Sequence, residues 1–179
     1  MKISNIIVLF ALSFSITLHA DESAISLIRM QYKTIRDLLP TLRKQSLELS
    51  DYSTDGGRAT AFRDDKNTIR LIRVELYGES GKVIEEYYYK NSVLFFTIQE
   101  SHRYNVPYYV AREMAKEAGG IAFDPKKTKI TEDRYYFENG KLIQWINESK
   151  KNIDGITKEF KDAEIETLKF STMLLERLN

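Results

Sequence analysis

The chain has 179 residues, of which 42% are hydrophobic, 27 are basic and 26 are acidic. This length suits one domain with its own core and is short for two domains. The near balance of charges gives no electrostatic reason to expect a nucleic acid or a membrane surface as a partner. Cysteine is absent, which excludes disulfides, a cysteine nucleophile and cysteine-ligated zinc.

Residues 1–20 have the pattern of a cleavable signal peptide. Lys2 gives a positive start, residues 6–18 form an apolar run, and Ala20 is a small residue before two acids. We predict cleavage after Ala20 and a periplasmic or secreted protein. The apolar run is shorter than the roughly 20 residues that span a bilayer, so we expect no stable membrane insertion. Residues 21–179 are then expected to form a single α+β domain.

The first expected element of that domain is an amphipathic helix. Its apolar residues are spaced by three and four positions, which places them on one face: Ile25, Ile28, Tyr32, Ile35, Leu39 and Leu42. Because Pro40 follows, we expect the helix to end or kink near Leu39. The spacing favours a helix packed on a sheet, and the alternative is a helix that pairs with another chain.

The next part of the chain predicts five strands joined by short turns. Alternating apolar and polar residues, separated by turn-forming residues, mark the ranges 47–49, 58–62, 69–77, 83–90 and 93–100. Consecutive strands with short connections form an antiparallel meander. The stretch 101–129 then interrupts the pattern with two prolines and a Gly-Gly pair, and its middle, 109–118, is compatible with a short helix. Loops of this length are often functional.

A near-repeat identifies the last hairpin. The sequence of residues 87–94, YYYKNSVL, returns as YYFENGKL at residues 135–142. Asn139-Gly140 predicts a tight turn in which both residues have positive φ. A C-terminal helix follows, with Ile165, Leu168, Thr172, Leu175 and Leu178 on one face. The expected fold is α+β: an antiparallel meander of about six or seven strands, with the N- and C-terminal helices packed on one face.

These motifs carry a resemblance. Residues 54–61 and 76–82, together with the two tyrosine-rich hairpins, resemble uncharacterised secreted bacterial proteins built on a β-hairpin meander. More distantly, the chain is similar to MORN-like hairpin repeats. It departs from them because the closing Gly-x-Gly is missing and Ser92 replaces the turn glycine in the first copy. The resemblance implies the fold and no activity, cofactor or catalytic residue.

Residues able to support catalysis are few. After removal of residues 1–20, His102 is the one remaining histidine, and we expect it to be structural or exposed. Four glutamates of one predicted hairpin could supply a pair for glycoside hydrolysis: Glu75, Glu79, Glu85 and Glu86. The neighbouring arginines and lysine instead favour cross-strand charge pairs. Acidic turns match no calcium loop. We therefore predict no catalytic residue, metal ligand or cofactor.

Aromatic side chains give the remaining functional signal. Tyrosine and tryptophan are enriched where proteins bind partners, and alternation places some of these rings on each face of the sheet. We predict Tyr88, Tyr136 and Trp145 as a contact surface, whereas the alternative is that the rings complete the core. The favoured function is a binding or inhibitory module for a protein or glycan of the cell envelope, acting through this aromatic face or through residues 101–129. A carboxylate-dependent hydrolase and an envelope assembly subunit that pairs through residues 25–42 are the alternatives.

Overall fold

The computed structural model describes residues 9–178, so the predicted signal peptide, residues 1–20, lies partly outside the described residues. The described part of the chain begins with a long helix, α1 (Leu9–Leu38), and a short 3-10 turn, η1 (Leu39–Thr41). The predicted end near Leu39 is confirmed. Within residues 9–178, no helix is long and apolar enough to cross a membrane.

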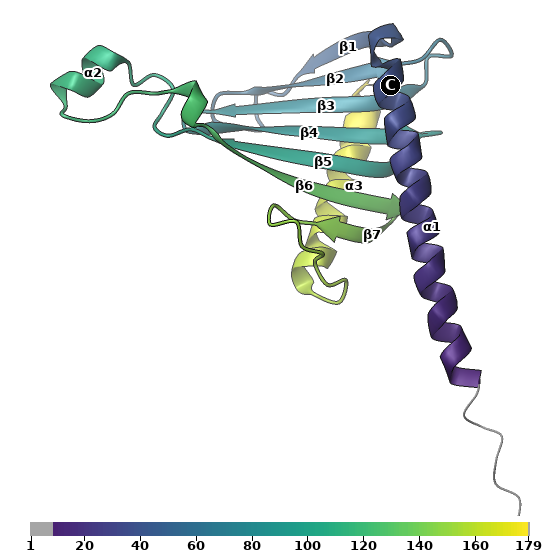
Figure 1. Ribbon diagram of the computed structural model, residues 1–179. Coiled ribbons are helices and arrows are strands. Elements are labelled where there is room, and N and C mark those ends of the chain that lie inside the picture. The colour runs from purple at the N-terminus through teal and green to yellow at the C-terminus, as the bar shows by residue number, and fades with distance from the viewer. Residues whose placement is uncertain (1–8, 179) are drawn as a thin grey trace, which may run out of the picture.

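Seven strands form one antiparallel sheet whose spatial order is the order along the chain. Each strand pairs with the next through a short turn, apart from the longer excursion between β5 and β6 (Figure 1). The predicted α+β class and meander are confirmed. The strands are β1 (Arg43–Glu48), β2 (Gly57–Arg63), β3 (Ile69–Gly78), β4 (Gly81–Lys90), β5 (Val93–Arg103), β6 (Lys129–Glu138) and β7 (Lys141–Ile146).

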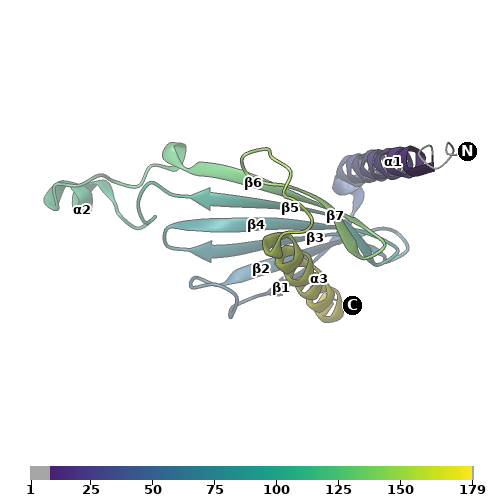
Figure 2. The same cartoon turned by 90° about the horizontal axis from the view of Figure 1, so that it is seen from below.

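The two long helices cover opposite faces of this sheet, which corrects the expectation that both pack on one face. Figures 1 and 2 show α1 on one side and the C-terminal helix, α3 (Lys158–Leu178), on the other. The tyrosine triplet at 87–89 explains the arrangement. Tyr88 packs in the core with α1, whereas Tyr87 and Tyr89 pack in the core with α3. Because successive strand residues point to opposite faces, both faces are aromatic and both need a cover.

Helix α3 is confirmed, but its buried stripe differs from the predicted one. Ile165 is 62% exposed, whereas Ser171 is buried. The hydroxyl groups of Ser171 and Tyr89 lie 2.9 Å apart and form a hydrogen bond. A buried tyrosine hydroxyl needs such a partner, because leaving it unsatisfied would cost folding free energy. The need to satisfy Tyr89 therefore explains a polar residue on the buried side of the helix.

The turns of the two tyrosine-rich hairpins have the same conformation. Asn139 and Gly140 have φ values of 51° and 75°, which confirms the predicted turn. Asn91 and Ser92, with φ values of 51° and 61°, adopt the same left-handed region in the first hairpin. Asparagine enters this region more readily than most residues, whereas serine does so at a cost. The first turn is therefore formed without the glycine that the second turn uses.

Replacement of Gly140 by valine tests the conformational demand of this turn. No atom lies within 4 Å of a Cβ built at Gly140, so the expected cost comes from the backbone conformation and not from a clash. A β-branched residue fits positive φ poorly, and we expect a loss of unfolding free energy of about 1 kcal/mol or more. Gly120→Val is the control, because Gly120 is exposed and lacks positive φ. Equal stability of the two variants in urea titrations would contradict the prediction.

Residues 104–128, here called the arm, project beyond the ends of the strands (Figure 1). The arm contains α2 (Arg112–Glu117) and a 3-10 turn, η2 (Pro125–Lys127), and α2 confirms the short helix predicted within 109–118. Local contacts order the arm. The Asn105 side chain donates to the Ala122 carbonyl and accepts from the Asp124 backbone amide, and the rings of Tyr104 and Phe123 pack edge to face at 5.1 Å.

Candidate functional site

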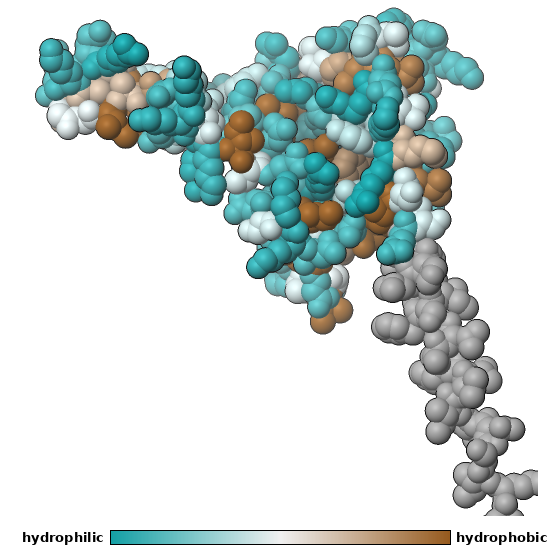
Figure 3. All heavy atoms as spheres, viewed as in Figure 1, coloured by the Kyte–Doolittle hydropathy of each residue, from teal (hydrophilic) through white to brown (hydrophobic). Residues whose placement is uncertain are grey.

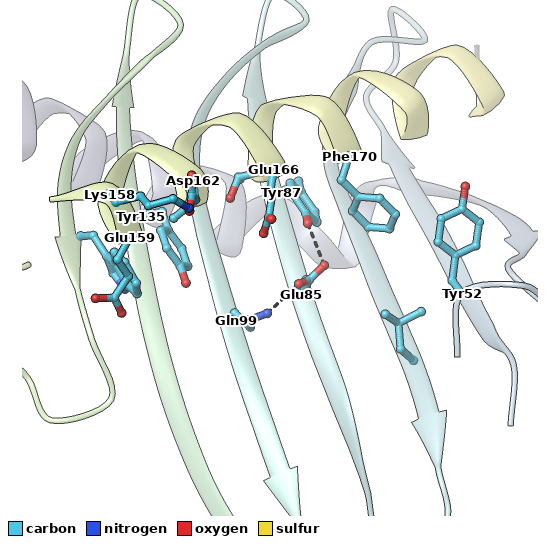
Figure 4. Close-up of a pocket in the computed structure, with 14 residues that line it drawn as sticks. Tyr52, Glu85, Tyr87, Gln99, Tyr135, Lys158, Glu159, Asp162, Glu166 and Phe170 are labelled. Carbon is cyan, nitrogen blue, oxygen red and sulfur yellow. Dashed lines mark hydrogen bonds and ion pairs between the residues drawn. The ribbon is translucent and has the colours of Figure 1, made fainter. Parts of the chain in front are cut away.

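A hollow of about 830 Å³ lies between α3 and the face of the sheet that it covers (Figure 4). Strands β3 to β7 and the loop before β2 supply one wall, and the first half of α3 supplies the other. The hollow is lined by aromatic rings and by acidic side chains. These residues are Tyr52, Leu76, Glu85, Tyr87, Gln99, Tyr135, Trp145, Lys158, Glu159, Asp162, Ala163, Glu166, Thr167 and Phe170.

Strand register places the polar and aromatic residues in two neighbouring rows. Glu85 of β4 is opposite Gln99 of β5, and both lie in one row. The next row lies two residues further along each strand. It contains Tyr87 of β4 and the cross-strand pair formed by Tyr135 of β6 and Trp145 of β7. Residues two apart on a strand share a face, so both rows face α3. The sheet thus presents a carboxylate beside a band of rings.

Glu85 is the acidic group of the sheet wall. One of its oxygens accepts a 2.7 Å hydrogen bond from the Tyr87 hydroxyl, and the other accepts a 2.8 Å bond from Gln99 Nε2 (Figure 4). Desolvation raises the pKa of Glu85, and the two hydrogen bonds oppose this rise. Within the described residues, Glu85 has no cationic partner at salt-bridge distance. The hollow therefore holds a carboxylate whose hydrogen-bond donors are all uncharged.

The aromatic wall is fixed by packing and by one further hydrogen bond. Tyr135 stacks on Trp145 with ring centroids 5.3 Å apart and an interplanar angle of 27°. Trp145 Nε1 donates to Asp133 at 2.8 Å, which satisfies the indole N–H. On the other side of the hollow, the ring centroids of Phe170 on α3 and Tyr87 lie 6.0 Å apart. Rings held by such contacts form a preorganised apolar surface.

Helix α3 contributes a row of acids to the opposite wall. Glu159, Asp162 and Glu166 are spaced by three and four residues, so they share one face of the helix. Asp162 forms a salt bridge with Lys158, the one basic residue of the lining. Four carboxylates therefore line the hollow against one ammonium group, so the lining carries a net negative charge, although Glu159 and Glu166 lie at its solvent-exposed side.

Two of the three residues predicted as a contact surface are buried in the core beneath α1. Tyr88 and Tyr136 are 0% and 1% exposed, because both rings are buried in the core that α1 covers. They form no outward surface, and the structure corrects that part of the prediction. Trp145 is 8% exposed and lines the hollow. Of the three predicted residues, Trp145 alone belongs to the candidate site.

The four glutamates considered for hydrolysis are not brought together. Glu85 faces α3, whereas Glu75 and Glu86 face the α1 side, where both form salt bridges with Arg73. Glu79 lies in the exposed β3–β4 turn, and its carboxylate lies 3.4 Å from the Tyr109 hydroxyl. The proposed pair is thus divided between two faces and a turn. The predicted cross-strand charge pairing is confirmed for Glu86 with Arg73, whereas Glu75 pairs with Arg73 within the same strand.

Two other predicted surfaces can now be located. The arm exposes several large apolar side chains among hydrophilic ones (Figure 3): Tyr108, Tyr109, Met114 and Ile121. Helix α1, for which pairing with another chain was the alternative, buries Ile25, Ile28 and Ile35 on the protein's own sheet. This packing confirms the prediction of a helix covering a sheet. His102 is partly buried, and its Nε2 lies 3.1 Å from Glu100 Oε2.

Within the described residues, no group of three or more histidine, aspartate or glutamate side chains is arranged to hold a metal ion. Comparisons with models of protein families, with curated proteins and with solved structures found no match for this chain. The resemblance to MORN-like hairpins stays a prediction.

Sequence reasoning missed most of the hollow, although part of its signal was present. The acids of α3 recur with helical spacing on one face, which could have marked an electronegative stripe. The position of Gln99 opposite Glu85 depends on the turn at Asn91-Ser92 and on a one-residue shift of the register between Tyr88 and Tyr89, which the turn alone does not reveal. The space between helix and sheet depends on side chains distant in sequence, and no local pattern reveals it.

Proposed function

We propose that the protein is a binding module and that a small organic molecule occupies the hollow between α3 and the sheet. The observation that carries this proposal is the hollow itself, with its volume of about 830 Å³ and its aromatic lining. Sites for small molecules typically measure about 300–1,000 Å³ and combine apolar walls with a few oriented polar groups. The aromatic rings supply contact area for the ligand, and the polar groups of Glu85 and Gln99 fix its orientation.

Binding without covalent chemistry accounts for these residues better than hydrolysis does. Glycoside hydrolysis uses two carboxylates with distinct protonation states on either side of the scissile bond. Glu79 and Glu86, which the sequence offered as acids for such a reaction, lie outside the hollow. The stacked pair of Tyr135 and Trp145 and the facing ring of Phe170 instead suit a ligand with a flat or apolar part.

We also propose that the protein acts outside the cytoplasm after cleavage behind Ala20. The support is the pattern of residues 1–20, with Lys2 before an apolar run and Ala20 before two acids. An amino terminus at Asp21 in the native protein is the matching observation, and retention of Met1 would contradict it.

The binding proposal is tested by retention of small molecules. Protein incubated with extract of its own cells is washed, denatured and analysed by mass spectrometry for released compounds. Ala163→Phe places a ring in the hollow, because Ala163 lines it, and we expect this variant to lose the compound retained by the native protein. Ile165→Phe adds the same ring to the exposed side of α3 and should retain it. Equal retention by both variants would contradict the proposal.

A further inference from the structure

We propose that the ligand of the hollow is a cation, a protonated organic amine whose ammonium group lies beside Glu85 while its apolar part contacts the aromatic wall. This inference rests on the proposed function, because it names the chemical class that the same hollow would bind. It goes beyond that function by assigning the charge of the ligand and the residue that recognises it.

The first argument is the charge of the lining. Glu85 faces the hollow from the sheet, and Glu159, Asp162 and Glu166 face it from α3, while Lys158 supplies the one compensating charge. Lys158 is also engaged, since its ammonium group pairs with Asp162. The N-terminus of a helix carries only about half a positive elementary charge, so the start of α3 does not reverse the balance. An anion would meet net repulsion here, and a cation would meet attraction.

The second argument is the environment of Glu85. Its oxygens accept hydrogen bonds from the Tyr87 hydroxyl and from Gln99 Nε2, and neither donor carries a charge. A carboxylate oxygen has two acceptor sites, so each oxygen of Glu85 can accept one bond more. A carboxylate in a poorly solvated position is stabilised by an adjacent cation much more than by neutral donors. An ammonium group entering the hollow would supply that missing charge.

The third argument is the aromatic wall, which favours a cation over a neutral polar group. The faces of tyrosine and tryptophan rings attract cations through their quadrupoles, and the attraction is stronger where the cation is shielded from water. Tyr135 and Trp145 lie in the strand row next to Glu85 and line the same hollow, whereas the Tyr87 ring of that row is 2% exposed and its hydroxyl donates to Glu85. Recognition of amines by rings beside a carboxylate uses both contributions at once. A purely apolar ligand would contact the rings and leave Glu85 without a cationic partner.

Three probes of one shape separate these possibilities: 4-phenylbutylamine, 4-phenylbutanol and 4-phenylbutyrate. Their binding is followed by the emission of Trp145, the one tryptophan of the chain, which lies at the hollow. We expect the amine to bind about tenfold more tightly than the alcohol, which corresponds to about 1.4 kcal/mol, and the carboxylate to bind most weakly, because four carboxylates and one ammonium group line the hollow. Added salt should reduce the preference for the amine.

Replacement of Glu85 by glutamine removes the charge and keeps the shape. The amide oxygen can accept from Gln99, and the amide N–H can donate to the Tyr87 oxygen. The pKa of Glu85 is raised in the folded protein, so its ionisation above that pKa costs folding free energy, and Glu85→Gln should fold at neutral pH. We expect about a tenfold loss of amine affinity and unchanged alcohol affinity. Glu79→Gln, at an exposed turn outside the hollow, is the matched control and should bind as the native protein does.

The outcomes distinguish this inference from the function on which it rests. Equal affinity for the amine and the alcohol, or an amine affinity that Glu85→Gln leaves unchanged, would overturn the assignment of a cationic ligand and leave the hollow as a binding site. Absence of binding by all three probes would instead count against the hollow as a site for small organic molecules.

Discussion

Replacement of Tyr88 by alanine is expected to destabilise the fold by about 3–5 kcal/mol, the usual range for truncating a large buried aromatic side chain. Tyr88 is 0% exposed. Its ring packs edge to face on Tyr32 with centroids 5.0 Å apart and lies 5.9 Å from Phe96. Its hydroxyl donates to Glu86, so truncation removes a hydrogen bond as well as apolar contacts. Chemical denaturation with a two-state fit measures the change.

The matched control is Tyr108→Ala on the arm, where the side chain is 53% exposed. Substitutions at exposed positions usually change stability by no more than about 0.5 kcal/mol. Similar unfolding midpoints for the two variants would show that Tyr88 is not part of a packed core and would restore the prediction of an outward binding residue. The comparison thus separates a structural from a surface role for the tyrosine-rich hairpin.

Replacement of Glu86 by alanine is expected to reduce the unfolding free energy by about 2 kcal/mol. Glu86 accepts from Arg73 Nη1 at 3.0 Å and from Arg36 Nη1 at 3.3 Å, and it also accepts the Tyr88 hydroxyl. Arg36 belongs to α1, so the carboxylate joins that helix to the sheet. Hydrogen bonds to charged groups contribute about 1.5–3 kcal/mol each, but both arginines are partly exposed and solvent screens their charges.

Glu48→Ala provides the control for this prediction. Glu48 pairs with Arg58 at 3.3 Å, but both side chains are more than half exposed. Exposed ion pairs contribute about 0–1 kcal/mol, so this variant should be close to the native protein in stability. If the two alanine variants lose the same stability in urea titrations, Glu86 does not join α1 to the sheet in the way described.

Local patterns predicted the strands from β2 onward well because turns and alternation are local properties, whereas β1 (Arg43–Glu48) begins before the predicted range 47–49. Asn139-Gly140 adopts positive φ at both residues, and the strand that follows Asn91-Ser92 begins where the alternation begins. The face of the sheet on which each helix packs is not determined by local sequence. Alternation assigned Tyr87 and Tyr88 to opposite faces, but it could not show that each face is covered by a different helix.

The candidate site was harder to predict for the same reason. Glu85 and Glu86 are neighbours in the chain and have similar chemistry, yet one lines the hollow and the other forms ion pairs beneath α1. Which of them meets a cavity depends on the side on which α3 packs, and only the tertiary structure provides that information. Trp145 was singled out by its residue type, since tryptophan combines a large ring with one polar group, and it lines the hollow, while its role in binding stays a prediction.

The most direct test of the binding proposal is to locate a bound probe by intermolecular nuclear Overhauser effects. With 4-phenylbutylamine added to the protein, we expect contacts from the phenyl protons to Tyr135, Trp145 and Phe170, and contacts from the methylene next to the nitrogen to Gln99. Contacts confined to the exposed side chains of the arm, Tyr108 and Met114, would contradict the account and assign binding to that surface instead.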